Sequence, residues 1–154
     1  MTIRIGPISL LTEQDTARLA QRLASVLVKG DCILLVGHIG AGKTAFARAL
    51  IRSLIGENED VPSPTFTLVQ TYETAEFEIW HCDLYRLTQP DEVMELGLDA
   101  AFDGAVTIIE WPDRLGELVP VAAITLEFAA MTDHHQVTVT APDIWGDRLD
   151  WINV

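Results

Sequence analysis

One eight-residue run constrains the fold more than any other part of this 154-residue sequence. Residues 37–44 read GHIGAGKT and match the pattern G-x-x-x-x-G-K-T. The apolar stretch 31–37 before them predicts a short buried strand, and residues 44–55 after them repeat apolar side chains at helical spacing. A strand, a tight glycine turn and a helix in this order are typical of α/β folds.

The same run predicts a cradle for phosphate groups. Glycines let the backbone wrap around an anion with several N–H groups turned inward, and the helix that follows adds its positive end. Lys43 is expected to bridge the β- and γ-phosphates, and the Thr44 hydroxyl to bind magnesium. The alternative is an ordinary glycine-rich turn. The predicted nucleotide-binding residues are Gly37, His38, Ile39, Gly40, Ala41, Gly42, Lys43, Thr44 and Ala45.

The order of patterns along the chain predicts a single α/β domain with a mixed central sheet flanked by helices. We expect an N-terminal helix at 12–29, a nucleotide-binding core at 30–128, and a C-terminal hairpin and tail at 122–154. Within the core, strands 67–73 and 76–83 form a hairpin, and residues 90–104 form one crossover helix before a strand at 105–111. Strands 122–129 and 135–141 form an antiparallel pair at the sheet edge.

Two acidic residues lie at the ends of predicted buried strands. A metal ion that is bound to phosphate needs carboxylate ligands at such a position. Asp83 closes the run EIWHCD, in which alternation puts His81 and Asp83 on one face. Glu110 ends the dry run VTIIE, where an ionised carboxylate is costly unless a cation or donor compensates it. Ligand crevices of α/β sheets lie beyond the carboxyl ends of parallel strands. Asp83 and Glu110 are therefore candidate magnesium and catalytic residues, with a strand-end cap or a solvated charge as the alternatives.

Three further residues are candidates for the same crevice. Arg86 could reach a phosphate, or lie on the surface. Thr65, in the loop PSPTF, could sense the γ-phosphate as a switch residue or belong to a plain proline turn. Trp111 could wall the crevice or close over the core beneath Pro112, and the structural role is preferred.

Composition narrows the classes of partner. The net charge is −13, and ten Lys and Arg are scattered among 23 acidic residues, so unaided nucleic-acid binding is not expected. Cys32 and Cys82 lie in apolar stretches and predict buried thiols rather than a disulfide framework. No membrane span or signal peptide is evident, and cytoplasmic residence is the expectation.

The segments GHIGAGKTAF, VPSPTFTLVQTYE, HCDLYRL, DEVMELGLDAAF and IIEWPDRL follow one another in the order and spacing of a known family. The chain resembles the TsaE (YjeE) family, small bacterial P-loop ATPases of tRNA threonylcarbamoyladenosine biosynthesis. The resemblance covers roughly residues 30–128. The combination of PSPTF, H-x-D-x-Y-R-L and I-E-W is far more specific than the P-loop alone.

The resemblance implies an Mg²⁺-dependent ATPase that is weak alone and stimulated by partner proteins. It also implies that Thr44 and Asp83 lie around magnesium, that Glu110 lies near magnesium or the attacking water, and that Thr65 belongs to a switch loop. It implies TsaD and TsaB as partners, with tRNA reached through them, and an ATP cycle that resets their complex between turnovers. His38 and Asp113 depart from the family, which usually has an acidic residue and glutamate there.

Two other functions stay open on the sequence. A small-molecule kinase would use Asp83 as a base toward an acceptor hydroxyl, although no arginine-rich lid segment is present. A GTP-driven switch would need N-K-x-D, which lysines at 29 and 43 alone cannot supply. The tail 141–154 is expected to dock on the body through Trp145 and Trp151, with a partner contact as the alternative.

Overall fold

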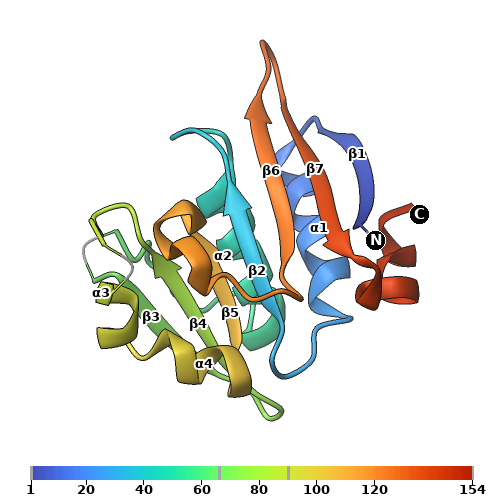
Figure 1. Ribbon diagram of the computed structural model, residues 1–154. Helices are drawn as coiled ribbons and strands as arrows, with labels where there is room; N and C mark the ends of the chain where they lie inside the picture. Colours follow the sequence, from blue (N-terminus) through green and yellow to red (C-terminus); the bar gives the residue numbers. More distant parts are fainter. Residues whose placement is uncertain (1, 66, 90, 154) are drawn as a thin grey trace.

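Four parallel strands form the centre of a seven-stranded sheet in the computed structural model, which describes residues 2–65, 67–89 and 91–153 (Figure 1). The central strands are β6 (Ile124–Ala130), β2 (Cys32–Val36), β5 (Val106–Glu110) and β4 (Glu78–Asp83). The full order is β1-β7-β6-β2-β5-β4-β3. The mixed sheet confirms the predicted fold class, and its central strands end at a common edge.

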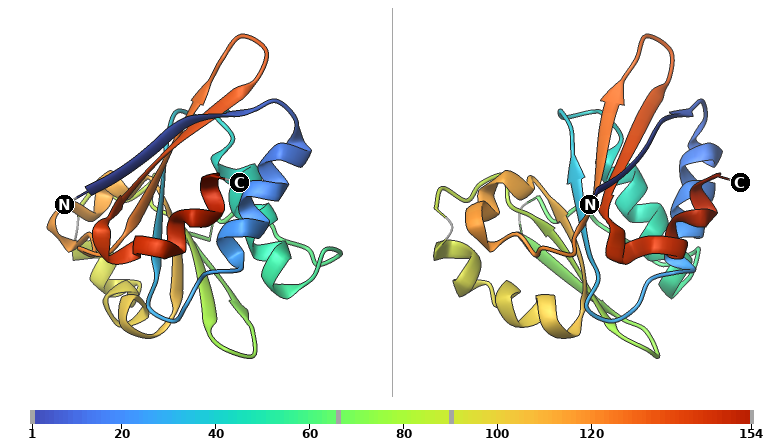
Figure 2. Two further views of the ribbon diagram at one scale, coloured as in Figure 1. Left: turned by 90° about the vertical axis from the view of Figure 1, so that its right-hand side faces the viewer. Right: turned by 45° about the vertical axis from the view of Figure 1, so that its right-hand side comes forward.

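Helices cover the two faces of this sheet. On one face lie α1 (Glu13–Ala24) and α2 (Lys43–Ile55), and on the other lie α3 (Asp91–Glu95), α4 (Leu98–Gly104) and the 3₁₀ segment η1 (Pro112–Leu118) (Figure 2). Ile33 and Leu35 of β2 pack in the core on the α1–α2 side, whereas Cys32 and Leu34 pack in the core on the α4 side. Burial on both faces explains why β2 and β5 read as uninterrupted apolar runs.

The two outer parts of the sheet are antiparallel. β3 (Val69–Glu73) pairs with β4, and β7 (His135–Pro142) pairs with β6, which confirms both predicted hairpins. The second pair does not form the edge, because β1 (Thr2–Leu10) adds on outside β7. The sequence analysis missed β1. Its alternation changes phase at Gly6–Pro7, where a bulge lets Ile5 and Ile8 both pack against the core.

Two predicted helices differ from those in the structure. Residues 91–104 form α3 and α4 instead of one crossover helix, because Gly97 between them has φ +84° and caps the start of α4, and Pro90 at the predicted start lies outside the described residues. The N-terminal helix ends at Ala24 instead of residue 29. It begins as predicted, with Thr12 and Asp15 forming a capping box. Within the described residues, no helix is long and apolar enough to cross a membrane.

The C-terminal segment η2 (Asp143–Asn153) docks against the body of the molecule on the α1 side. Trp145 is buried and donates its Nε1–H to Ala122 O at 2.7 Å. Arg148 donates to Val26 O just beyond α1, forms an ion pair with Asp31, and stacks on Trp145. These contacts confirm the predicted docking for Trp145. The side chain of Trp151 lies outside the described residues.

Candidate functional site

The glycine loop, Asp83 and Glu110 meet at the carboxyl edge of the parallel strands. β2 runs directly into the loop, β4 ends at Asp83 and β5 ends at Glu110. Asp83 and Glu110 are direct neighbours in the parallel register of β4 and β5. The expectation that both carboxylates share the edge with the glycine loop is therefore met in the fold.

In the loop, a side chain at Gly37 would clash with the backbone of β6, and one at Gly42 would crowd a neighbouring side chain. A Cβ at Gly37, where φ is +144°, would lie 2.6 Å from the carbonyl oxygen of Phe128 in β6. Gly42 has φ +107° and forms the N-cap of α2, and a Cβ there would lie 3.3 Å from Nδ1 of His135. The loop is thus fixed between β6 and the start of β7, with backbone angles that favour glycine.

The start of α2 presents backbone donors to the space above the loop. No side chain caps this helix, because its N-cap is glycine. The N–H groups of a first helical turn have no partner within the helix and attract anions. Lys43 is the first residue of α2, is 5% exposed, and donates its Nζ–H to Gly37 O at 2.6 Å. Its ammonium group therefore lies inside the curve of the loop.

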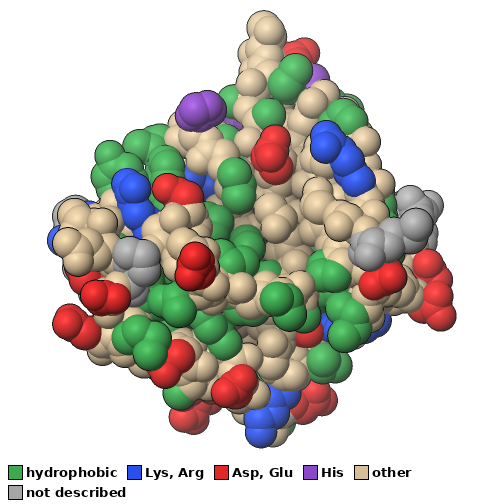
Figure 3. All heavy atoms as spheres, viewed as in Figure 1, with side chains coloured by type: hydrophobic (Ala, Val, Ile, Leu, Met, Phe, Trp, Pro, Cys, Tyr) green, Lys and Arg blue, Asp and Glu red, His purple; other side chains and the backbone are tan. Residues whose placement is uncertain are grey.

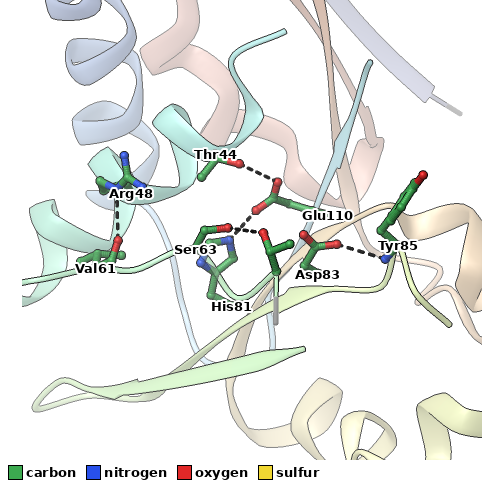
Figure 4. Close-up of polar contacts among 9 residues, drawn as sticks. Thr44, Arg48, Val61, Ser63, His81, Asp83, Tyr85 and Glu110 are labelled. Carbon is green, nitrogen blue, oxygen red and sulfur yellow. Dashed lines mark hydrogen bonds and ion pairs between the residues drawn. The ribbon is translucent and has the colours of Figure 1, made fainter. Parts of the chain in front are cut away.

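Glu110 lies at the centre of the polar contacts, as Figure 4 shows. Thr44 donates its hydroxyl to Oε1 of Glu110 at 3.0 Å, and Nε2 of His81 lies 2.7 Å from Oε2. Both oxygens of a carboxylate that is only 3% exposed therefore have partners. We call Thr44, His81, Asp83 and Glu110 the carboxylate cluster.

Asp83 adds a second buried carboxylate to this cluster. It is 8% exposed, and its Oδ1 accepts a hydrogen bond from the N–H of Tyr85 at 3.0 Å. Hydroxyl and carboxylate oxygens are the ligands that Mg²⁺ prefers, usually one or two from the protein with phosphate oxygens and water completing the shell. Thr44, Asp83 and Glu110 fit that requirement. No group of three or more His, Cys, Asp and Glu in the described part of the chain could form a metal site by itself.

Trp111 contacts the lysine of the loop. The Nζ atom of Lys43 lies 3.9 Å from the centre of the Trp111 ring, and Tyr85 packs on Trp111 with ring centroids 4.9 Å apart. Burial lowers the pKa of Lys43 below its ordinary value, while the charges of Glu110 and Asp83 act in the opposite direction. Trp111 also packs on the core of the α4 side. The structural role is therefore observed, and a role of Trp111 as a wall of the nucleotide crevice stays a prediction.

Four further predicted residues, Thr65, Arg86, His38 and Ile39, are exposed. Thr65 is exposed, and its hydroxyl pairs with that of Ser63 at 2.7 Å within the same loop. Arg86 is exposed and follows Asp83 by three residues. His38 and Ile39 are exposed at the tip of the glycine loop, where Ile39 is 81% accessible. The contacts and the strand register described above thus bring together Lys43, Thr44, Asp83, Glu110 and Trp111.

A groove that the sequence analysis did not predict opens on the other side of the glycine loop. It has a volume of about 680 Å³ and is lined by side chains from residues 10–21, 42–57 and 131–135. Gly42 and Ala45 connect it to the loop, Thr16 and Ala17 of α1 form one wall, and the turn between β6 and β7 forms another. No local sequence signal marks the groove, because three separate segments build it.

His81 is the second residue without a predicted role. The sequence analysis placed it on the same strand face as Asp83 but gave it no function. In the structure its side chain is 1% exposed and contacts Glu110. A histidine inside a strand does carry a signal when its face also ends in a carboxylate, because a buried imidazole needs a hydrogen-bond partner.

Comparison with known proteins identifies the family. The model of the family described as "Threonylcarbamoyl adenosine biosynthesis protein TsaE" matches residues 10–138. A relative from Rickettsia bellii, named tRNA threonylcarbamoyladenosine biosynthesis protein TsaE, is 43% identical over 124 residues, which are 80% of this chain and 86% of that protein. A relative of the same name from Rickettsia felis is 45% identical over 120 residues, 77% of this chain and 70% of that protein.

A solved structure shows the same fold. The crystal structure of YdiB from Bacillus subtilis superposes with a TM-score of 0.75 and covers 99% of this chain and 95% of its own, at 22% sequence identity. At that identity the likeness concerns the fold alone. The match to the family model and the curated relatives, which extend over most of the sequence, show that the chain belongs to the TsaE family.

Proposed function

We propose that the protein binds ATP with Mg²⁺ and hydrolyses the ATP as a step in tRNA threonylcarbamoyladenosine biosynthesis. The observation that carries this proposal is the contact of Thr44, on the helix of the glycine loop, with Glu110 at the end of β5. It joins the expected phosphate-binding motif to a buried carboxylate at 3.0 Å. The names of the curated relatives supply the pathway.

The parts of the site have separate roles in this proposal. Backbone N–H groups at the start of α2 and the Lys43 ammonium group bind the phosphates. Thr44, Asp83 and Glu110 would hold Mg²⁺, and the bound metal would supply positive charge next to the phosphate oxygens. Glu110 also faces the attacking water. Thr65 would act as a switch residue, and Arg86 as a contact to a phosphate.

The groove accommodates the rest of the nucleotide. It adjoins the glycine loop at Gly42 and Ala45, on the side opposite the carboxylate cluster, and a volume of about 680 Å³ is enough for a base and a ribose. Placing the phosphates at α2 therefore puts the nucleoside between α1 and the β6–β7 turn. We propose adenine as the base, following the family resemblance.

The partners in this proposal are TsaD and TsaB, with tRNA bound through them. On the face shown in Figure 3, acidic side chains are spread widely and the basic ones stand apart. With a net charge of −13, the protein is poorly suited to hold a nucleic acid directly. Its hydrolysis cycle would reset the TsaD–TsaB complex after each modified tRNA.

A reconstituted system tests the proposal. Purified protein, TsaD, TsaB, tRNA, ATP, Mg²⁺ and an activated threonylcarbamoyl donor should give many modified tRNAs per TsaD–TsaB complex. Lys43→Ala should limit the system to few turnovers, whereas Lys29→Ala, the exposed second lysine, should behave as wild type. Multiple turnover with Lys43→Ala would refute the role of ATP.

The base and the reaction class are tested separately. Competition between ATP and GTP for binding identifies the base. ADP formed without any added acceptor supports an ATPase, whereas strict dependence on a small-molecule acceptor would favour the kinase alternative.

A further inference from the structure

His81 occupies a position from which it reaches the carboxylate of Glu110 across two strands. Its neighbour in the parallel register of β4 and β5 is Ile108, so Glu110 lies two residues farther on the same face. That face packs toward α2, as the placement of Ile79 and Ile108 in the α1–α2 core shows. The imidazole therefore meets Glu110 inside the protein, on the side that carries Thr44.

The two partners of Glu110 come from different elements and bind different oxygens. His81 of β4 contacts Oε2 at 2.7 Å, and Thr44 of α2 donates to Oε1 at 3.0 Å. Since an ionised carboxylate only accepts hydrogen bonds, Nε2 of His81 is the donor. The last torsion of a glutamate side chain is broad and weakly restrained by itself. The contacts at Oε1 and Oε2 therefore fix this torsion in Glu110.

The second ring nitrogen of His81, Nδ1, indicates that the side chain serves its contact with Glu110 and not packing alone. Nδ1 is buried and has no hydrogen-bond partner among the described residues. A buried polar atom without a partner destabilises the fold by about 1–3 kcal/mol. A residue kept at this position for packing alone would avoid that penalty by being apolar, as Ile79 and Ile108 are. The imidazole is thus suited to place one N–H on Oε2.

We propose that His81 is a positioning residue, which holds the Glu110 carboxylate with Oε1 toward Thr44 and the glycine loop. This inference rests on the proposed function, because the reaction it assists is ATP hydrolysis. His81 acts through Glu110, and it touches neither nucleotide nor metal. Partners of this kind typically change activity or metal affinity by about 10- to 100-fold when they are removed.

Three variants at position 81 separate positioning from packing. His81→Gln places an amide N–H where Nε2 lies, His81→Asn places one where Nδ1 lies, and His81→Leu removes the donor. We expect kcat for ATP hydrolysis to fall about 10- to 100-fold in His81→Leu and His81→Asn, and to recover largely in His81→Gln. The KM for ATP should change less than about threefold in all three, because the loop and the groove are intact.

A double-mutant comparison tests whether His81 acts through Glu110. In a Glu110→Gln background, His81→Leu should lower kcat no further, because the carboxylate that His81 orients is already absent. A second drop of similar size would overturn the proposal. Equal kcat in His81→Gln and His81→Asn would also overturn it, and this comparison remains valid if His81→Leu fails to fold.

Failure of the inference is distinguishable from failure of the proposed function. Wild-type protein that forms no ADP with Mg²⁺ and its partners refutes the proposed ATPase, whatever the variants do. Active wild-type protein together with wild-type kcat in His81→Leu refutes the positioning role alone. Thermal unfolding of each variant identifies a loss of activity that merely follows a loss of folded protein.

Discussion

The two sides of the glycine loop are built in different ways. Toward β5, Thr44 contacts a carboxylate that is 3% exposed, and Lys43 lies against the ring of Trp111. Toward β6, the groove is open, and its walls come from α1, α2 and a turn. The buried side fixes a few atoms by short contacts, as bond-breaking chemistry requires. The open side spreads recognition over many side chains. Substitutions on the buried side should therefore lower the rate of ATP hydrolysis, and substitutions in the groove should lower the affinity for ATP.

The largest effect is expected at Lys43, because its ammonium group lies in the glycine loop between the buried side and the groove. Lys43→Ala removes the ammonium group in the loop, and charge-assisted hydrogen bonds are worth about 1.5–3 kcal/mol each, or roughly 10- to 150-fold in affinity. Hydrolysis should become undetectable. Titration calorimetry with ATP and Mg²⁺ measures the loss, with Lys29→Ala as the control. Binding at wild-type affinity would show that the loop does not hold the phosphates.

Glu110→Gln should lower the rate of ATP hydrolysis by about 100-fold or more and change the affinity for ATP little. Glu110→Ala would be less informative, because it would leave the part-buried Thr44 and the buried His81 without this partner, at a cost of about 1–3 kcal/mol. Glutamine keeps the shape and removes the charge. Steady-state ADP release measures kcat, and Glu117→Gln, on the exposed surface of η1, is the matched control. Unchanged kcat would remove Glu110 from the chemistry.

Substitutions of Trp111 test whether this side chain contributes to the buried side of the site. Trp111→Leu removes the ring from Lys43, and such cation–π contacts contribute about 0.5–2 kcal/mol, roughly 2- to 30-fold. Trp111→Phe keeps a ring in place and should lie nearer to wild type. The affinity for ATP and kcat of both variants provide the comparison. Identical values for leucine and phenylalanine would limit Trp111 to the core of the α4 side.

The smallest effect is expected in the groove. Thr16→Trp would crowd the wall that α1 contributes and should raise the dissociation constant for ATP about fivefold, the loss of roughly 1 kcal/mol, without changing kcat at saturating ATP. Gln14→Trp, on the same helix but away from the groove, is the control. A lower kcat with unchanged affinity in Thr16→Trp would contradict the expectation that the groove determines the affinity for ATP and the buried side determines the rate.

The central strands and the glycine loop were predictable because their signals are local. β2 and β5 are uninterrupted apolar runs, the loop is a contiguous pattern, and the runs EIWHCD and VTIIE placed Asp83 and Glu110 at strand ends. β1 was missed because the bulge at Gly6–Pro7 shifts its alternation by one residue. A single crossover helix was predicted across Gly97, but the positive φ of this glycine separates α3 from α4.

The unpredicted parts of the site depend on contacts between distant residues. His81 and Glu110 are 29 positions apart, and only the register of β4 and β5 brings them together. The groove needs α1, α2 and the β6–β7 turn at once. A pattern along one segment states which face a residue lies on, but the partner across that face is set by strand order and helix placement.

The position of β1 has a consequence for how the protein is made. Of the strands described, β1 is synthesised first, yet its partner in the sheet is β7, which is synthesised last: Thr2 pairs with Pro142 and Leu10 with His135. Pairings between such distant segments form slowly. β1 therefore cannot take its place in the sheet until β7 has been synthesised. Arg4 and Pro7, both exposed on this strand, make it a poor template for pairing with other chains before then.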